Sequence, residues 1–271
     1  MGEASRGMTR RVLLGALGTG VVGGAAGLAA GYRFRTELRD VKLRMLAPGR
    51  SMPAQIGAFR REARRIFARH AAQTAESVAA LKRKYRGEVF GRIHVWDLLQ
   101  KLAHCIDPTD MRLFCGSQLV HAHQVVAAME ANGVGDRDML LLGLIHDLGK
   151  VLLLSGEAPE NVVCFSRRIS GGGPGAGLDR VVFQYGHPEF VYSRIADHVP
   201  PHVAWVARHH NIEIEDCWPF MTEQEREWSR RYLEPFQRFD GDFVSPYYIP
   251  RVDEERLRAL VESYFPRPIV V

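Results

Sequence analysis

Two adjacent ionisable residues interrupt an apolar segment of this chain. His146 and Asp147 stand in LIHDLGKVLLL, residues 144–154, among leucine, isoleucine and valine. Burying an unpaired imidazole or carboxylate costs several kcal/mol, so a nearby group must compensate. A metal ion is the compensating group that these two residue types favour. The alternative, a buried pair without a ligand, is the weaker interpretation because the flanking apolar run leaves no solvent to satisfy the pair.

Four further residues, from separate parts of the chain, offer metal-binding atoms. They are His121 in LVHAHQ, His187 in YGHPEF, His210 in ARHHN and Asp240 in FQRFDGD. With His146 and Asp147 they make four imidazoles and two carboxylates. Such a set suits iron, manganese, zinc or nickel better than calcium or copper(I).

Six ligands suggest two metal ions more readily than one. If Asp147 bridges them, one ion takes His121, His146 and Asp240, and the other takes the two remaining imidazoles. Open positions would then be left for a substrate and for oxygen or water.

Spacing alone does not choose between neighbouring residues of the same type. His123 competes with His121, and the same ambiguity affects two other sites, where the competitors are His209 and Asp242. A histidine in a helical protein is more often an ordinary hydrogen-bonded residue than a ligand. That interpretation applies to His70, His94, His104, His198 and His202.

The apolar periodicity predicts an all-α fold, with eight helical segments that position these residues. They span residues 54–86, 95–104, 118–131, 137–154, 188–197, 201–209, 222–232 and 253–264. Asp107-Pro108 is expected to end one helix before the next begins. No strand pattern persists, and no repeat is present.

Length and composition indicate a globular protein with an unusual N-terminus. The chain has 271 residues, 46% of them hydrophobic, and a net charge of +5. Arg10 and Arg11 precede about twenty uncharged residues, long enough to span a bilayer. We predict a twin-arginine-like signal or membrane anchor at 1–35, a linker at 36–55 and a catalytic domain at 56–271. A buried N-terminal helix is the alternative.

The basic charge lies mainly between residues 33 and 92, where basic residues outnumber acidic ones about three to one. It could meet anionic lipid, or it could be a solvated helix face; no nucleic-acid partner is expected. Four cysteines without short paired spacing suggest neither a zinc ribbon nor a redox dithiol, although export would permit disulfides. The loop SGGGPGAG, residues 170–177, lacks the context of a phosphate-binding loop and is expected to be a lid or a flexible connector.

The ordered motifs of the chain resemble those of the myo-inositol oxygenase family, within the HD-domain superfamily. The matching segments are AAQTAESV, VWDLLQKL, VHAHQ, GLIHDLGKVL, GLDRVVFQYGHPEF, VARHHN and FQRFD. Similarity extends from about Arg60 to the C-terminus and implies an HD-domain helical bundle. It selects His121 over His123 and His210 over His209.

The resemblance also implies a cofactor and a reaction. The ligands would be His121, His146, Asp147, His187, His210 and Asp240. They would hold two Fe ions as a mixed-valent Fe(II)/Fe(III) pair bridged by the aspartate. With O2 as co-substrate, the family carries out a four-electron, ring-opening oxidation of a cyclic polyol, myo-inositol to glucuronate.

Lys150, one turn beyond His146, is the predicted catalytic residue, because its ammonium would stand beside the substrate oxygen and favour deprotonation. The alternative is a lysine that extends to the surface. Lys150, Asp107 and Asn211 are the predicted substrate contacts.

Three departures from the family affect the substrate. Val244 stands where the family has a substrate-gripping lysine, Cys164-Phe165 replaces a Gly-Asp pair, and Asn211 replaces a serine. Loss of hydrogen-bonding groups weakens recognition of a polyol steeply. We therefore expect a less polar alcohol or polyol, with inositol itself still a candidate.

Three functions stay open at this point. The first is the inositol-oxygenase-like di-iron oxygenase; the second is an HD-type metal-dependent phosphohydrolase. The third is a membrane-tethered homologue that binds metal without turnover. We expect a monomer with a small-molecule substrate, anchored in or exported across a membrane, or cytoplasmic if the N-terminal segment is not used.

Overall fold

The computed structural model describes residues 52–110, 112–113, 116–163 and 165–271. The predicted signal or anchor at 1–35 lies outside these residues and stays a prediction. No helix within the described ranges is both long and apolar enough to cross a membrane. The described chain is mostly helical, which confirms the all-α prediction at the level of fold class.

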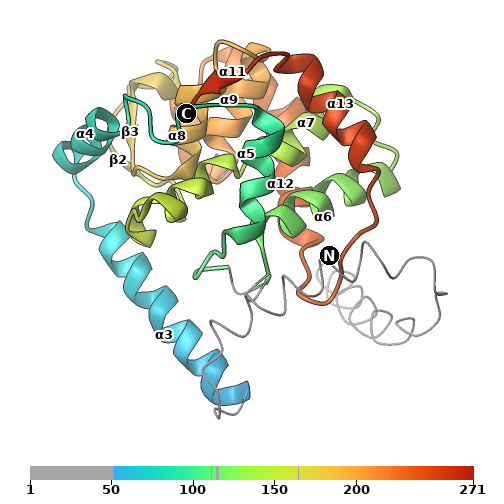
Figure 1. Ribbon diagram of the computed structural model, residues 1–271. Coiled ribbons are helices and arrows are strands. Elements are labelled where there is room, and N and C mark those ends of the chain that lie inside the picture. Colours follow the sequence, from blue (N-terminus) through green and yellow to red (C-terminus); the bar gives the residue numbers. More distant parts are fainter. Residues whose placement is uncertain (1–51, 111, 114–115, 164) are drawn as a thin grey trace, which may run out of the picture. The chain divides into compact units, whose positions relative to one another are not determined.

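An antiparallel helix pair forms the centre of the fold. Helix α6 (Gln118–Ala131) is almost entirely buried, and α7 (Arg137–Ile145) packs against it. Ser117 caps α6 and Asp136 caps α7, each accepting backbone N–H bonds through its side chain. The turn between them contains Gly133 with φ +78°. Figure 1 shows the pair in green, with α12 beside both helices.

The predicted helix 137–154 is interrupted where the chemistry begins. The α-helix ends at Ile145, and the 3-10 segment η3 (Leu148–Ser155) follows after His146 and Asp147. Asp147 has φ −96° and ψ 4°, outside the α-helical range. Hydrophobic periodicity did not reveal the break, because η3 is as apolar and as buried as α7. A change of helix type of this kind often marks a functional position.

A second helix pair packs against the first. It consists of α8 (His187–Ile195) and α9 (Pro201–His209), which contact each other. Each has proline in its first turn, where the missing N–H is tolerated. Helix α8 also packs on η3, and α9 packs on α7. These contacts bring the beginning of α8 and the end of α9 to the break after α7.

The C-terminal helices continue further than the sequence predicted. The predicted helix 222–232 is α11 (Glu223–Trp228), followed by a π-helical turn, η7 (Ser229–Leu233), and by α12 (Glu234–Asp242). Pro235 is accommodated in the first turn of α12. Helix α12 packs against α6 and α7, and α13 (Glu254–Tyr264) packs on α7 from further along the chain.

The predicted helix 54–86 is also two helices. Helix α3 (Met52–Ala71) starts within the predicted linker and ends before Thr74, whose side chain forms a capping box with Ser77 at the start of α4 (Ala75–Lys84). The remaining helical elements are α5 (Val95–Lys101), η2 (Leu102–His104), η4 (Pro159–Asn161), η5 (Leu178–Arg180), α10 (Ile214–Cys217) and η6 (Trp218–Phe220).

Four short strands in the described part of the chain were not predicted from the sequence. β1 (Arg92–Ile93) pairs antiparallel with β4 (Ile269–Val270), and β2 (Arg168–Gly171) pairs antiparallel with β3 (Val181–Phe183). Strands of two to four residues are too short to show an alternating pattern. The glycine-rich loop 170–177 begins in β2, and the N–H groups of Gly175 and Gly177 donate to carbonyls of η6.

Candidate metal centre

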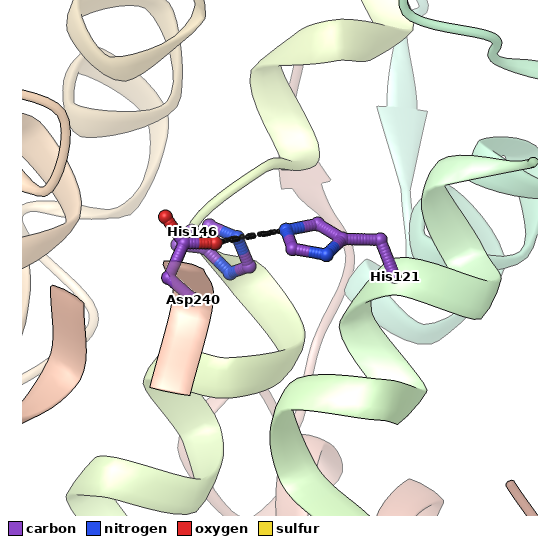
Figure 2. Close-up of side chains that lie close together, drawn as sticks. All are labelled: His121, His146 and Asp240. Atoms are coloured by element: carbon purple, nitrogen blue, oxygen red, sulfur yellow. Dashed lines mark hydrogen bonds and ion pairs between the residues drawn. The ribbon is translucent and has the colours of Figure 1, made fainter. Parts of the chain in front are cut away.

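The first half of the site joins three helices. His121 lies on α6, His146 follows the last residue of α7, and Asp240 lies on α12. Asp240 Oδ1 is 2.9 Å from His121 Nε2 and 3.3 Å from His146 Nε2, and the two Nε2 atoms are 3.2 Å apart. Figure 2 shows the three side chains pointing toward one another. They form a cluster that could hold one metal ion.

The second half comes from the second helix pair. His187 is the first residue of α8, and His210 follows the last residue of α9. Their Nε2 atoms are 3.1 Å apart. Asp147 Oδ1 lies 3.0 Å from His187 Nε2 and 3.7 Å from His210 Nε2.

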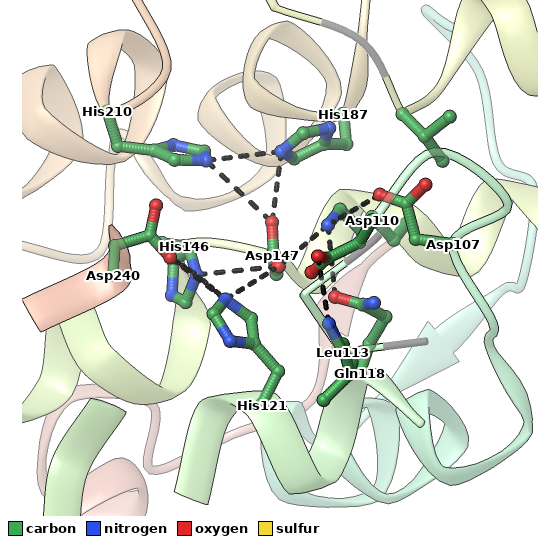
Figure 3. Close-up of polar contacts among 12 residues, drawn as sticks. Asp107, Asp110, Leu113, Gln118, His121, His146, Asp147, His187, His210 and Asp240 are labelled. Carbon is green, nitrogen blue, oxygen red and sulfur yellow. Dashed lines mark hydrogen bonds and ion pairs between the residues drawn. The ribbon is translucent and has the colours of Figure 1, made fainter. Parts of the chain in front are cut away.

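Asp147 connects the two halves through its two oxygens. While Oδ1 faces His187 and His210, Oδ2 lies 3.5 Å from His121 Nε2 and 3.4 Å from His146 Nε2. Figure 3 shows this carboxylate between the two imidazole pairs. The structure therefore brings all six sequence-predicted ligands together and places Asp147 in the bridging position.

Gly149 permits the approach of the two halves. A Cβ atom at this position would lie 2.1 Å from the backbone oxygen of His187, far inside contact distance. With hydrogen in its place, η3 packs directly on the start of α8. The glycine two residues after Asp147 thus lets His187 reach the bridging carboxylate.

Backbone carbonyls fix the orientation of three of the imidazoles. His187 donates from Nδ1 to Val162 O at 2.6 Å, and His210 donates from Nδ1 to Ala207 O at 2.9 Å. His146 Nδ1 lies 3.2 Å from the carbonyl oxygens of both Leu142 and Gly143. A carbonyl can only accept, so Nδ1 of each ring donates to the backbone, and Nε2 is the ring atom that faces the site.

In the second half, the Nε2 atoms of His187 and His210 converge on one oxygen of Asp147. A neutral imidazole nitrogen and a carboxylate oxygen are both acceptors. Burial lowers the pKa of His187 to about 4, so its ring is neutral at neutral pH. Converging acceptors repel one another unless a cation lies among them. The donor set fits a transition-metal ion.

Burial and charge act in opposite directions in the first half. Burial lowers the pKa of His146, but the carboxylates of Asp147 and Asp240 outweigh burial and raise it to about 10. Burial raises the pKa of both carboxyls, yet their cationic neighbours hold them well below their usual range. Both aspartates are therefore ionised. A metal ion would take the place of the proton on His146.

Lys150 is buried rather than extended to the surface. Its Nζ atom lies 3.0 Å from each of Asp147 Oδ2, Asp107 Oδ2 and Gln118 Oε1. These three acceptors match the three N–H donors of an ammonium group. Burial lowers the pKa of Lys150, but Asp147 and Asp107 outweigh burial and raise it. The ammonium thus holds Asp147 Oδ2 in place. A substrate that binds the ammonium must displace one of its three acceptors.

A cavity of about 240 Å³ opens onto this centre. It is lined by metal-site residues, by the three predicted substrate contacts Asp107, Lys150 and Asn211, and by Phe67, Thr109, Asp110, Arg112, Val163 and Phe165. Val244, which replaces the lysine of the resembled family, is not among the lining residues of the described chain.

The competing neighbours lie elsewhere. The ring of His209 packs against Phe183 and Trp205, and Asp242 lines a different surface hollow. His123 is buried, which lowers its pKa to about 4, and it belongs to neither described cluster of possible ligands.

Sequence reasoning missed the residues that support the ligands. Gln118 holds Lys150, and Gln73 and His70 hold the backbone segments that adjoin His187. Gln118 opens the helix that carries His121, but a polar residue in a first turn is common and gives no distinct signal. His70 was expected to be an ordinary hydrogen-bonded residue, and both its ring nitrogens do face backbone carbonyls.

Fold and site together define the class of protein: an all-α protein with a buried histidine and aspartate centre suited to two metal ions. Comparison with known proteins is consistent with this class. A family model described as myo-inositol oxygenase matches residues 61–168, a range that includes His121, His146 and Asp147.

Individual relatives extend the match beyond that range. Inositol oxygenase 1 of Arabidopsis thaliana is 23% identical over 245 residues, covering 73% of this chain and 76% of the relative. Probable inositol oxygenase of Oryza sativa subsp. japonica is 24% identical over 245 residues, with the same coverage of both chains. Inositol oxygenase of Homo sapiens is 24% identical over 239 residues, covering 73% and 82%. The chain is therefore similar to the myo-inositol oxygenase family over most of its length, and this similarity indicates an oxygenase enzyme.

Proposed function

We propose that this chain is a di-iron oxygenase that uses O2 to oxidise a C–H bond of an alcohol or polyol. One observation carries the proposal: His187 Nε2, His210 Nε2 and Asp147 Oδ1 converge at 3.0–3.7 Å, beside a second cluster on the other oxygen of Asp147. Two cations, bridged by Asp147, would satisfy both clusters. The relatedness to inositol oxygenases supports iron as the metal and oxidation as the reaction.

The six ligands would divide between two ions, although His146 lies within reach of both sets. His121, His146 and Asp240 would hold one ion, His187 and His210 would hold the other, and Asp147 would contribute one oxygen to each. When bound, a pair of iron ions supplies a Lewis acid for a substrate hydroxyl and a reducing site for O2.

The protein's own groups orient the ligands and place a positive charge beside them. Carbonyl oxygens of Val162 and Ala207 keep the His187 and His210 rings turned toward the site. The ammonium of Lys150 offsets the charge of Asp147 and Asp107 and lies at the cavity wall. If the ammonium gives up one acceptor, it can donate to the substrate oxygen and stabilise its deprotonated form.

The number of electrons transferred can be stated for myo-inositol, the substrate of the related family. With myo-inositol, one ring C–C bond would break to give glucuronate, and O2 would accept four electrons. One oxygen atom would enter the product, and the other would leave as water. Inositol is therefore one of the substrates to be tested.

A phosphohydrolase is less consistent with the cavity. Phosphate binding usually requires cations with free donors. Here Lys150 is held by two carboxylates, and Arg112 donates to Gly241 O with Asp110 3.7 Å from its Nε atom. The cationic groups of Lys150 and Arg112 are thus already paired with groups of the protein.

Anaerobic reconstitution with iron tests the proposal. We expect about two iron ions per chain, an electron paramagnetic resonance signal of a mixed-valent pair, and O2 uptake that depends on an added alcohol or polyol. Cleavage of bis(4-nitrophenyl) phosphate without a mixed-valent signal would instead support a phosphohydrolase. A protein that binds iron but is inert toward both substrate classes would support the non-catalytic alternative.

A further inference from the structure

We infer that the cavity takes an uncharged alcohol with an apolar body, rather than a ring that bears a hydroxyl group on every carbon. This inference rests on the proposed function, because the metal pair is the group that would bind the substrate hydroxyl. It concerns the part of the cavity away from the metal ligands.

Three apolar side chains line that part of the cavity, and we call them the apolar wall. Phe67 comes from α3, and Val163 and Phe165 come from the segment after η4. Phe67 is 38% exposed and Phe165 is 52% exposed, although both are large aromatic residues. A ligand body that contacted these rings would remove apolar surface from water.

The polar groups around this wall are already paired with one another. Asp107 Oδ1 accepts from the backbone N–H of Thr109 at 2.7 Å and from its hydroxyl at 2.6 Å, and Asp107 Oδ2 faces Lys150. Asp110 Oδ1 accepts from the N–H groups of Arg112 and Leu113 at 2.9 and 3.1 Å. These carboxylates face donors of the protein itself.

The formal charges at the wall also balance. Apart from the ligands Asp147 and Asp240, which face the metal site, Asp107 and Asp110 contribute two negative charges, and Lys150 and Arg112 contribute two positive ones. An uncharged body meets no uncompensated charge here, whereas a charged one would have to break an existing pair.

The cavity has room for a six-membered ring. Its volume of about 240 Å³ corresponds to roughly eight water molecules at about 30 Å³ each. A six-membered ring with one or two hydroxyl groups is of this order. Each additional hydroxyl placed against the apolar wall would lose its water without gaining a partner.

A series of ring alcohols on the anaerobic, iron-loaded protein tests this inference by binding alone. Calorimetry with cyclohexanol, cis-1,2-cyclohexanediol and myo-inositol varies the number of hydroxyl groups on one ring size. We expect the mono-alcohol or the diol to bind about 100-fold more tightly than myo-inositol. Tightest binding by myo-inositol, or no binding by any of the three, would overturn the inference.

Substitution of the wall tests its assignment. Phe165→Ala should weaken binding of the diol about tenfold without changing the iron content. Phe165→Asn should shift the preference toward myo-inositol by supplying a polar partner. Tyr247→Ala is the matched control, because Tyr247 is 95% exposed and lies outside the cavity. Equal diol affinity in Phe165→Ala and the control would overturn the assignment.

Iron content shows whether a negative result contradicts only the substrate preference or the proposed function as well. If the protein binds two iron ions but prefers myo-inositol, the proposed function stands and the apolar specificity falls. If it binds no iron, the proposed function fails, and the inference fails with it.

Discussion

The carboxylate of Asp147 presents one oxygen to each of two imidazole pairs. Its neighbours differ in how they are held, since His187 and His210 are each fixed by a backbone carbonyl through Nδ1. A side chain that is oriented in this way has little freedom to serve any purpose other than ligation. The consequences of removing individual groups follow from this arrangement.

The loss of one imidazole should remove one metal ion. His187→Ala leaves the second ion only one imidazole and one carboxylate oxygen, so iron content should fall from about two to about one per chain. The mixed-valent signal should disappear. The exposed histidine in His104→Ala serves as the control and should retain both ions. Two ions and an unchanged spectrum in His187→Ala would contradict the assignment.

A methyl group at residue 149 should separate the two halves of the site. Gly149→Ala places Cβ 2.1 Å from the His187 carbonyl oxygen, so the backbone must shift at a cost of about 1–3 kcal/mol in unfolding free energy. Thermal unfolding and iron content measure the effect. Gly135→Ala, whose Cβ would meet no atom within 4 Å, is the control. Equal stability and equal iron content in the two variants would show that the close approach is unimportant.

The junction between α3 and α4 supports the second half of the site from outside. Gln73 accepts from Tyr185 N–H at 2.7 Å and donates toward Tyr185 O at 3.2 Å and the Asn161 side chain at 3.0 Å. Tyr185 lies two residues before His187, and Asn161 precedes the Val162 carbonyl that orients the His187 ring. One side chain thus connects both segments that position this imidazole.

Gln73→Leu should therefore act on the metal centre as well as on stability. Unpaired buried groups cost about 1–3 kcal/mol each, and the loosened His187 should lower the occupancy of the second iron site more than that of the first. Iron content combined with the mixed-valent signal separates this effect from general destabilisation. Gln224→Leu, at an exposed helix position, is the control. A destabilised variant with both sites full would indicate a structural role only.

A second connection, between α4 and the segment before η4, should depend on pH. Burial raises the pKa of Glu157, but hydrogen bonds from Lys84, Tyr85 and Asn161 outweigh burial and lower it to about 2. In the unfolded chain, the pKa of this carboxyl is near the ordinary glutamate value of 4.5. Its stabilising contribution is therefore fully present above that pH and is lost as the pH falls toward about 2.

Glu157→Gln should remove this dependence. At pH 7 we expect a loss of about 1 kcal/mol in unfolding free energy, because the carboxylate is partly screened by solvent. The difference from the unsubstituted protein should shrink below pH 4.5 and vanish near pH 2. Denaturant unfolding at several pH values measures it. A difference that grows on acidification would contradict the sign.

At the scale of the whole molecule, the six ligands unite segments that are far apart in the chain. They range from residue 121 to residue 240 and come from α6, α8, α12 and the ends of α7 and α9. Binding to such a site occurs only in the folded state, so metal should stabilise the entire fold. The converging acceptors of the second half should also repel one another less when a cation is present.

Metal removal should therefore lower the melting temperature. At a free metal concentration 100-fold above Kd, stabilisation amounts to about 2.7 kcal/mol, or roughly 5–10 °C for a chain of this size. Differential scanning fluorimetry with Fe(II) under anaerobic conditions, with and without a chelator, measures this shift. The double variant His121→Ala/His187→Ala should show no shift. A shift that persisted in that variant would place the metal elsewhere.

Residue types and local order could be predicted from the sequence to a considerable extent. The all-α class and the bounds of α6 were predicted correctly, because α6 has a capping serine at one end and a glycine turn at the other. The conflict between charge and apolar surroundings at His146-Asp147 identified the centre of the site. The resemblance chose among neighbouring histidines that spacing left equivalent.

Features that depend on contacts between distant segments became visible only in the tertiary structure. The break after α7, the second helix at Ala75 and the extension to α12 are imposed by packing and by capping geometry that apolar periodicity does not encode. Only the packing of η3 on α8 shows why Gly149 is needed, and only three-dimensional proximity gives Lys150 its three acceptors. Local sequence determines which groups can ligate, whereas the burial of those groups against distant segments determines where their lone pairs point.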